Sequence, residues 1–262
     1  MSDLRIAFAG DRDIAVKVLR FLLGERIKPL ALLVSGEERA SHADELVALC
    51  GHLAPREVLR GKAFREPVGI ELLERLDPVF IICIHFPYIV PEAVLRIPRG
   101  GVLNLHPAYL PYNRGWHTAS WAIMEQTPYG ATLHFMDAGL DTGDIVHQRL
   151  IEVSPGDTAH SLYQRVKTLE MEVFKEAWPL LVSGQYERKP QQTSAGTNHK
   201  KKDLLVPQIQ RINLEEKVQA RELIRWLRAL TTSRTEEAAY YEVDGKRYRV
   251  QVKITEEPEQ SA

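Results

Sequence analysis

The sequence predicts an α/β protein whose core is a doubly wound, mostly parallel sheet. Short apolar runs alternate with amphipathic helical patterns through the first half of the 262-residue chain, which is the rhythm of βαβ units. The run from Val79 to Ile84 is apolar throughout, as expected for a strand buried on both faces at the centre of a parallel sheet. Hydrophobic residues make up 44% of the chain and charged residues 26%, a globular balance that supplies enough apolar material for a sizeable core.

The individual elements follow from the same patterns. A turn at Gly10-Asp11 separates the first strand from a helical pattern that runs through Val16, Leu19 and Leu22. Further helices are predicted at residues 39–49, 69–76, 91–95, 118–125 and 158–182, the last broken by its proline near the end. Strands are predicted at residues 5–9, 29–34, 79–84, 101–105, 130–136 and 143–153.

A shift in composition after Gly184 divides the chain into two predicted parts. Residues 1–184 form the expected catalytic domain, and residues 185–262 form a small C-terminal α+β region that begins with a polar loop at 189–202. A helix is predicted at 214–229, and strands at 239–243 and 248–253 flank Asp244-Gly245, a strong two-residue hairpin signal. The acidic tail from Thr255 is expected to fray.

Composition argues against several classes of function. A net charge of -1 and a pI near 6.8 give no electrostatic case for nucleic-acid binding. The two cysteines form no disulfide framework, and no apolar run approaches the ~20 residues that span a bilayer. The first strand and turn lack the G-x-G-x-x-G pattern, so NAD is not expected. These observations favour a soluble cytoplasmic protein.

Two polar residues at the end of the 101–105 strand are candidates for chemistry. Asn104 and His106 are two residues apart and therefore point the same way, at the edge where such sheets bind ligands. An amide and an imidazole aimed at one point can hold a carbonyl oxygen and manage a proton. Asp141, on the loop 137–142, can orient the imidazole or favour its protonated form. An isolated Asn-x-His would usually be structural, so longer patterns must support this interpretation.

No group of residues has the spacing of a metal site, and no metal is expected. His85, His134 and His147 are scattered along the chain. Each is interpreted as a structural histidine rather than a ligand.

Five longer strings together resemble the formyltransferase family, which includes methionyl-tRNA, glycinamide ribonucleotide and nucleotide-sugar formyltransferases. The resemblance covers roughly residues 5–182 and is weaker in the C-terminal region. It implies a Rossmann-like core, N10-formyltetrahydrofolate as co-substrate, and a catalytic trio of Asn104, His106 and Asp141. The strings are F-P-Y-I-V-P at 86–91, N-L-H-P-A-Y-L-P at 104–111, R-G at 114–115, G-A-T-L-H at 130–134 and D-A-G-L-D-T-G-D-I at 137–145.

The chemistry of these three residues suggests a mechanism, and the resemblance also implies a folate pocket. Asn104 and protonated His106 would hydrogen-bond to the oxyanion that forms when a neutral amine attacks the formyl carbon. Asp141 would pair with His106 or relay the amine proton through water, and the sequence leaves both open. The side chains of Phe86 and Tyr88 could pack in the core or at its rim as readily as bind the folate. The implied folate-binding residues, acting partly through backbone groups, are Phe86, Pro87, Tyr88, Ile89, Ala138, Gly139, Leu140 and Asp141.

Within the family, the segments 112–117 and 196–203 look most like sugar N-formyltransferases. Those enzymes act on nucleotide-linked amino sugars, typically 4-amino-4,6-dideoxyhexoses destined for surface polysaccharide. Cationic side chains would meet the pyrophosphate, and Trp116 or Tyr109 would stack on the base or flank the hexose. The lysine run 200–202 fits a solvated loop equally well. The expected substrate contacts are Tyr109, Arg114, Trp116, His117, Lys200 and Lys201, and a homodimer through the C-terminal region is expected from the family.

Three alternatives compete with this interpretation. A methionyl-tRNA formyltransferase-like enzyme would usually carry a larger C-terminal barrel and a basic surface. A formyltetrahydrofolate hydrolase would usually carry an extra N-terminal domain, whereas this sequence starts at the first core strand. A non-catalytic binding module is disfavoured by the complete trio. The nucleotide, the sugar stereochemistry and the position of the amine are left open.

Overall fold

The computed structural model describes residues 4–257, and its core is a seven-stranded sheet in the order β3-β2-β1-β4-β5-β7-β8. The pairs β1–β2, β1–β4, β2–β3 and β4–β5 are parallel, and β5 pairs with β7 in the antiparallel sense. The predicted doubly wound α/β sheet is therefore confirmed. The strands are β1 (Ile6–Gly10), β2 (Ala31–Val34), β3 (Val58–Arg60), β4 (Phe80–Ile84), β5 (Gly101–His106), β7 (Gly130–Phe135) and β8 (Ile145–Leu150).

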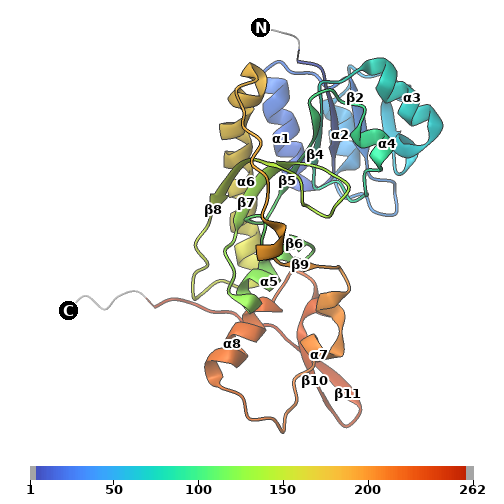
Figure 1. Ribbon diagram of the computed structural model, residues 1–262. Helices are drawn as coiled ribbons and strands as arrows, with labels where there is room; N and C mark the ends of the chain where they lie inside the picture. Colours follow the sequence, from blue (N-terminus) through green and yellow to red (C-terminus); the bar gives the residue numbers. More distant parts are fainter. Residues whose placement is uncertain (1–3, 258–262) are drawn as a thin grey trace. The chain divides into compact units, whose positions relative to one another are not determined.

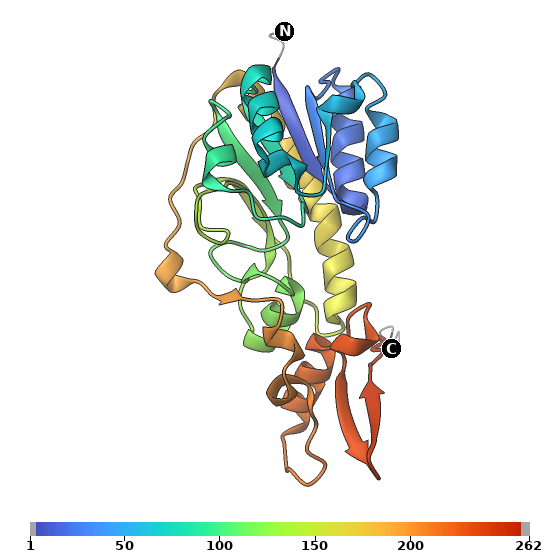
Figure 2. The ribbon, with the colours of Figure 1, turned by 90° about the vertical axis from the view of Figure 1, so that its right-hand side faces the viewer.

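Helices cover both faces of this sheet (Figures 1 and 2). Alternate strand residues such as Ala9, Leu33 and Cys83 pack with α3 and α4 in one buried cluster. On α1 and α6, Phe21 and Phe174 meet edge to face with ring centroids 6.1 Å apart. Strands β1, β2 and β4 are buried along their whole length, which explains their continuous apolar runs. The helices are α1 (Arg12–Gly24), α2 (Ala43–Leu49), α3 (Pro67–Leu76), α4 (Glu92–Leu95) and α6 (Ala159–Ser183).

The long helix α6 continues through Pro179 to Ser183, so the predicted break at this proline is wrong. A proline inside a helix removes one backbone hydrogen bond and crowds the preceding turn. Here it lies in the last turns, while Ala177, Trp178 and Leu181 beside it are buried. Packing of this apolar face offsets the local cost.

The chain divides into two compact units that interleave along the sequence. The first holds residues up to 106, 132–148 and 170–191, and the second holds residues 107–131, 149–169 and those from 192 onward. The second unit contains α5 (Thr118–Glu125), α7 (Pro207–Gln210), α8 (Ala220–Ala229), the two-residue strands β6 (Arg114–Gly115) and β9 (Asn198–His199), and the hairpin β10 (Ala239–Val243) and β11 (Lys246–Val250). Single 3-10 turns occur at Pro55–Glu57, Ala63–Arg65, Thr193–Ala195, Asp203–Leu205 and Thr235–Glu237.

The hairpin of the second unit turns where the sequence predicts. Asp244 and Gly245 have φ of 50° and 72°, the left-handed conformation that this turn needs at both positions. The helix predicted at 214–229 is shorter, because α8 begins only at Ala220. Leu214 and Val218 are 55% and 44% exposed, so residues 214–219 lack the packing that would stabilise a helix there. Most of the tail from Thr255 lies outside the described residues.

A buried hydrogen bond joins the end of β4 to α6 in the first unit. His85 follows β4 with φ of 50°, and its Nε2 lies 2.8 Å from Glu170 Oε1. The two side chains are 9% and 0% exposed. The other carboxylate oxygen, Oε2, is buried with no hydrogen-bond partner among residues 4–257. This carboxylate therefore depends on His85.

We expect His85→Leu to lower the free energy of unfolding by about 3–5 kcal/mol, because it leaves a buried carboxylate without its partner. Urea unfolding measures the change. The control is His147→Leu, whose pair with Glu176 is 32% and 44% exposed and should be worth less than about 1 kcal/mol. Equal losses in the two variants would contradict the account.

Candidate active site

Strand pairing places the first two candidate residues beside a third polar side chain. Asn104 and His106 lie on β5, and the antiparallel register sets Asn104 opposite His134 and His106 opposite Thr132 on β7. His106 and His134 are 7% and 1% exposed. The candidate site therefore lies on β5 and β7, which are adjacent and largely buried.

The loop between β7 and β8 is held by its own polar contacts. Asp137 Oδ1 accepts hydrogen bonds from the Gly139 N–H (2.9 Å) and the Thr142 hydroxyl (2.6 Å). Gln191 Nε2 donates to the carbonyls of Asp141 (3.1 Å) and Gly143 (2.6 Å). A Cβ on Gly143 would lie 2.0 Å from the Phe135 carbonyl oxygen, so only glycine fits. These contacts fix Asp141, whose φ is 53°.

The structure brings the predicted trio together. Asp141 Oδ2 lies 3.6 Å from His106 Nε2, and Asn104 Nδ2 lies 3.4 Å from Asp141 Oδ1. The side chains of His106 and Asp141 are 9% and 12% exposed, so water screens them little. An amide, an imidazole and a carboxylate from two distant stretches of chain thus converge, with separations longer than tight hydrogen bonds.

His134 joins this group, although the sequence alone indicates a structural role. Its Nδ1 lies 2.7 Å from the Phe135 carbonyl oxygen, and its Nε2 lies 3.1 Å from Asn104 Nδ2 and 3.7 Å from Asp141 Oδ1. Burial lowers the pKa of His134, while the nearby Asp141 carboxylate opposes that shift. The sequence could not place His134 in the site because its position depends on the register of β5 against β7, which no local sequence pattern defines.

The aromatic residues of the implied folate loop, 86–89, use their side chains for packing. Phe64, Phe86 and Tyr88 form an aromatic cluster with ring centroids 5.2–6.2 Å apart, in which Phe86 meets both other rings edge to face. Tyr88 Oη accepts from the Gly36 N–H and donates to Glu38, both at 3.0 Å. The sequence left open whether the Phe86 and Tyr88 side chains pack against the protein or contact the folate, and in the structure they pack against the protein.

The rest of the two implied folate segments is more accessible. Ile89 is 84% exposed and Leu140 is 48% exposed, which leaves apolar side chains available beside the backbone of each segment. The carbonyl of Pro87 accepts a hydrogen bond from Arg39 at 3.1 Å. Ala138 and Gly139 are also exposed.

The predicted substrate contacts lie in the second unit, and part of them cluster. Lys201 Nζ lies 5.1 Å above the ring of Trp116, which is 43% exposed. His117 Nε2 is 3.2 Å from the Lys201 carbonyl oxygen, and its Nδ1 is 3.8 Å from Glu237 Oε1. Burial lowers the pKa of His117, and Glu237 opposes the shift.

The other three predicted contacts differ in their exposure. Arg114 is buried and donates to the Thr193 carbonyl at 3.3 Å. Its Nε is buried without a hydrogen-bond partner in the described part of the chain. Tyr109 is half-buried, and Lys200 is exposed with its backbone N–H on Asp203.

Residues 4–257 contain neither a cluster of metal ligands nor a membrane-spanning helix. No group of three or more histidine, cysteine, aspartate or glutamate side chains is arranged to hold a metal ion in that range. None of the helices described is both long and apolar enough to cross a membrane.

Comparison with known sequences defines the family. The Formyl transferase profile matches residues 32–178, and the profile of the N-formyltransferase dimerization C-terminal domain matches residues 206–256. The chain therefore belongs to the formyl transferase family.

Among curated relatives, a methionyl-tRNA formyltransferase of Geobacter sulfurreducens is 32% identical over 199 residues, or 74% of this chain and 63% of that protein. The chain thus spans less than two thirds of that relative. A dTDP-4-amino-4,6-dideoxyglucose formyltransferase of Mycobacterium bovis is 31% identical over 192 residues, or 73% of this chain and 78% of that protein.

Solved structures share the fold over more than nine tenths of the chain. A sugar N-formyltransferase from a Shewanella species has a TM-score of 0.81 at 22% identity, covering 97% of this chain and 99% of the other. An N-formyltransferase from Helicobacter canadensis, solved with folinic acid and dTDP-3-aminofucose, has a TM-score of 0.68 at 21% identity, covering 92% and 85%. At these identities the likeness establishes the fold.

The lowered pKa of His134 has a consequence for stability. Its folded-state pKa lies below the ordinary value near 6.5. Between the two values the unfolded chain therefore binds more protons, and stability falls as pH drops through this range. We expect the wild type to lose more unfolding free energy than His134→Gln between pH 7.5 and 5.5, measured by urea titration. Identical losses would show that His134 does not titrate in this way.

Proposed function

We propose that this protein transfers a formyl group from N10-formyltetrahydrofolate to an amine, with Asn104, His106 and Asp141 as the catalytic residues. The observation that carries this proposal is the convergence of an amide, an imidazole and a carboxylate, with contacts of 3.4–3.6 Å, at the end of a largely buried strand. Such a group suits acyl transfer, because it offers donors to a developing oxyanion and a carboxylate for the accompanying proton.

The proposed reaction forms a bond between the acceptor nitrogen and the formyl carbon, and breaks the bond from that carbon to N10. Asn104 Nδ2 and His106 Nε2 both point at the region that the Asp141 carboxylate borders. In this position they donate to the formyl oxygen as it becomes negative. The Asp141 carboxylate stabilises the imidazole when it is protonated, and a proton passes from the acceptor nitrogen to N10, so that both reacting nitrogens end neutral.

The donor would lie along segments 86–89 and 138–141. Segment 86–89 continues from β4, the parallel neighbour of β5, and segment 138–141 carries Asp141 itself. Phe86 and Tyr88 hold their loop through packing, which leaves backbone groups and the exposed Ile89 and Leu140 for a planar ring. The N-formyltransferase from Helicobacter canadensis was solved with folinic acid bound, which supports a folate donor here.

The acceptor that we propose is a nucleotide-linked amino sugar, such as a 4-amino-4,6-dideoxyhexose. We propose that the enzyme acts in the cytoplasm and that its product is used to build surface polysaccharide. Support comes from the dTDP-amino-sugar relative, 78% of which is matched. Trp116 with Lys201 offers an exposed ring and a cation, the groups that a base and a pyrophosphate need. Tyr109, Arg114, His117 and Lys200 complete the proposed contacts. Methionyl-tRNA is the second candidate, favoured by 32% identity to its formyltransferase.

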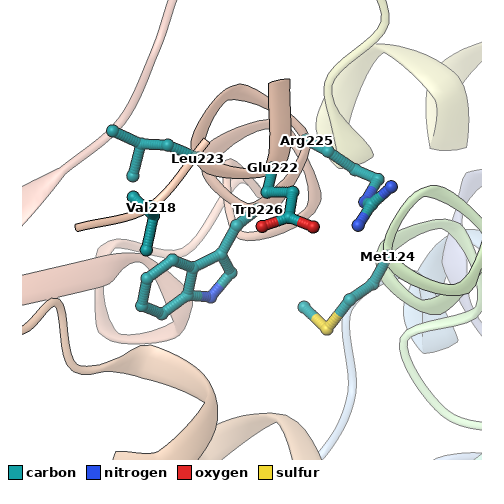
Figure 3. Close-up of a pocket in the computed structure, with 6 residues that line it drawn as sticks. All are labelled: Met124, Val218, Glu222, Leu223, Arg225 and Trp226. Atoms are coloured by element: carbon teal, nitrogen blue, oxygen red, sulfur yellow. The ribbon is translucent and has the colours of Figure 1, made fainter. Parts of the chain in front are cut away.

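We also propose a homodimer through the C-terminal region. The match to a dimerization domain over residues 206–256 supports it. So does a groove whose apolar lining is Met124, Val218, Leu223 and Trp226, with the charged side chains of Glu222 and Arg225 also lining it (Figure 3). On the hairpin, Val243 and Tyr248 are 42% and 44% exposed, and exposed apolar surface of this kind marks protein contacts.

Removing the proposed oxyanion donor should cost turnover. We expect Asn104→Ala to lower kcat by about 10²–10³, the loss typical of one such donor, and His106→Ala and Asp141→Ala to act in the same direction. Formyl transfer is followed by tetrahydrofolate release. The control is His147→Ala, a half-buried histidine on β8. Near-normal turnover in all three folded variants would refute the assignment.

Thermal denaturation in the presence of candidate acceptors distinguishes the substrate classes. A nucleotide-linked 4-amino sugar at 100-fold over its Kd should stabilise the protein by about 2.7 kcal/mol, with less effect from the same nucleotide without the sugar. A shift with methionyl-tRNA alone would favour the second candidate. Formate released from the donor with no amine present would instead indicate a hydrolase.

A further inference from the structure

The hydrogen-bond partners of His134 determine which of its ring atoms carries a proton. Nδ1 lies 2.7 Å from the carbonyl oxygen of Phe135. A carbonyl oxygen only accepts, so Nδ1 must carry the hydrogen. In the neutral ring, Nε2 is then a lone-pair acceptor. The lowered pKa of this buried histidine supports the neutral form.

This tautomer decides how the Asn104 amide is turned. The amide atom 3.1 Å from His134 Nε2 must be a donor, which makes it Nδ2. Nδ2 carries two hydrogens. One of these hydrogens is donated to His134 Nε2. The other points toward Asp141 Oδ1, which lies 3.4 Å from Nδ2. His106 Nε2 lies on the same carboxylate, 3.6 Å from Oδ2.

We propose that His134 is a positioning residue whose Nε2 lone pair fixes the orientation of the Asn104 amide, so that the second N–H of Asn104 is presented to the formyl oxygen. This inference rests on the proposed role of Asn104. The charged or titratable groups facing the ring are Asp141, 3.7 Å from Nε2, and His106, whose ring centroid lies 6.3 Å away at 86°, with a weaker influence from Asp137.

The Asn104 amide needs this contact because its NH₂ group and its oxygen are nearly equal in size, although one donates hydrogen bonds and the other accepts them. Without the acceptor on β7, the Asn104 amide can turn by half a rotation and exchange its NH₂ group for its oxygen. An oxygen facing the developing oxyanion repels it. Since that charge exists only in the transition state, loss of orientation should lower kcat and leave KM for the donor and the amine nearly unchanged.

Two substitutions separate the two hydrogen bonds of His134. In His134→Gln, Oε1 can replace the Nε2 acceptor. In His134→Asn, Nδ2 can still donate to the Phe135 carbonyl, but the side chain is too short to reach Asn104. We expect the Asn variant to lose at least about tenfold in kcat, less than the 10²–10³ lost with a whole oxyanion donor. The Gln variant should recover most of that loss.

A double-mutant cycle tests whether His134 acts through Asn104. In the Asn104→Ala background, His134→Asn should lower kcat by less than about twofold further, because the amide that it would misplace is absent. His147→Asn serves as the matched control on β8 and should leave kcat unchanged in both backgrounds. Urea unfolding of each variant confirms that the fold is retained.

The outcomes distinguish this inference from the proposed function. If Asn104→Ala is inactive while His134→Asn has normal kcat, the positioning role is overturned and the catalytic trio stands. Equal kcat in the Asn and Gln variants, or a full additional loss in the Asn104→Ala background, also overturns it. If Asn104→Ala keeps normal turnover, both the proposed role of Asn104 and the positioning role of His134 are wrong.

Discussion

The antiparallel pairing of β5 with β7 is the constraint on which the site depends. It is the point where a parallel sheet changes direction, and it sets Asn104 directly across from His134. Cross-strand neighbours in such a pair lie close enough for their side chains to interact. A slip of one residue would turn the amide and the imidazole to opposite faces. Burial of Leu103, Leu105, Leu133 and Phe135, all at or below 1% exposure, opposes such a slip.

The carboxylate reaches this strand pair only because its loop is anchored. Asp137 closes the loop on itself, and Gln191 binds the backbone on both sides of Thr142. Gln191 lies in the polar stretch that the sequence predicts to be a connecting loop. Its contacts hold Asp141 in a left-handed conformation that an aspartate adopts at some cost. Asn104 Nδ2 and His106 Nε2 lie 3.4 and 3.6 Å from this carboxylate, too far for tight hydrogen bonds. This arrangement suits a site that must accept a further oxygen.

Sequence patterns predicted the central strands and the hairpin well, because burial and turn chemistry are local signals. The apolar run at β4 and the Asp244-Gly245 turn are examples. Features that depend on distant contacts were missed. The strands β6 and β9 have two residues each and pair across more than 80 positions, and helix α8 starts later than its pattern predicts because residues 214–219 are not packed.

In the candidate site, too, local sequence signals could be predicted and contacts between distant residues could not. Asn104, His106 and Asp141 could be named as candidates from their strand end, spacing and loop, and the family resemblance was needed to favour a catalytic over a structural role. His134 could not be identified, since its partner on β5 is 30 residues away and only the strand register brings them together. Aromatic residues 86 and 88 could be read either way from sequence, and their packing with Phe64 was decided by the fold.

The most direct measurement is a crystal structure of the protein with a stable N10-formyl folate analogue and no amine acceptor. The account predicts a formyl oxygen within about 3.2 Å of Asn104 Nδ2 and of a ring nitrogen of His106, with the Asp141 carboxylate beside the formyl carbon. A formyl group bound outside hydrogen-bonding reach of both side chains would contradict it.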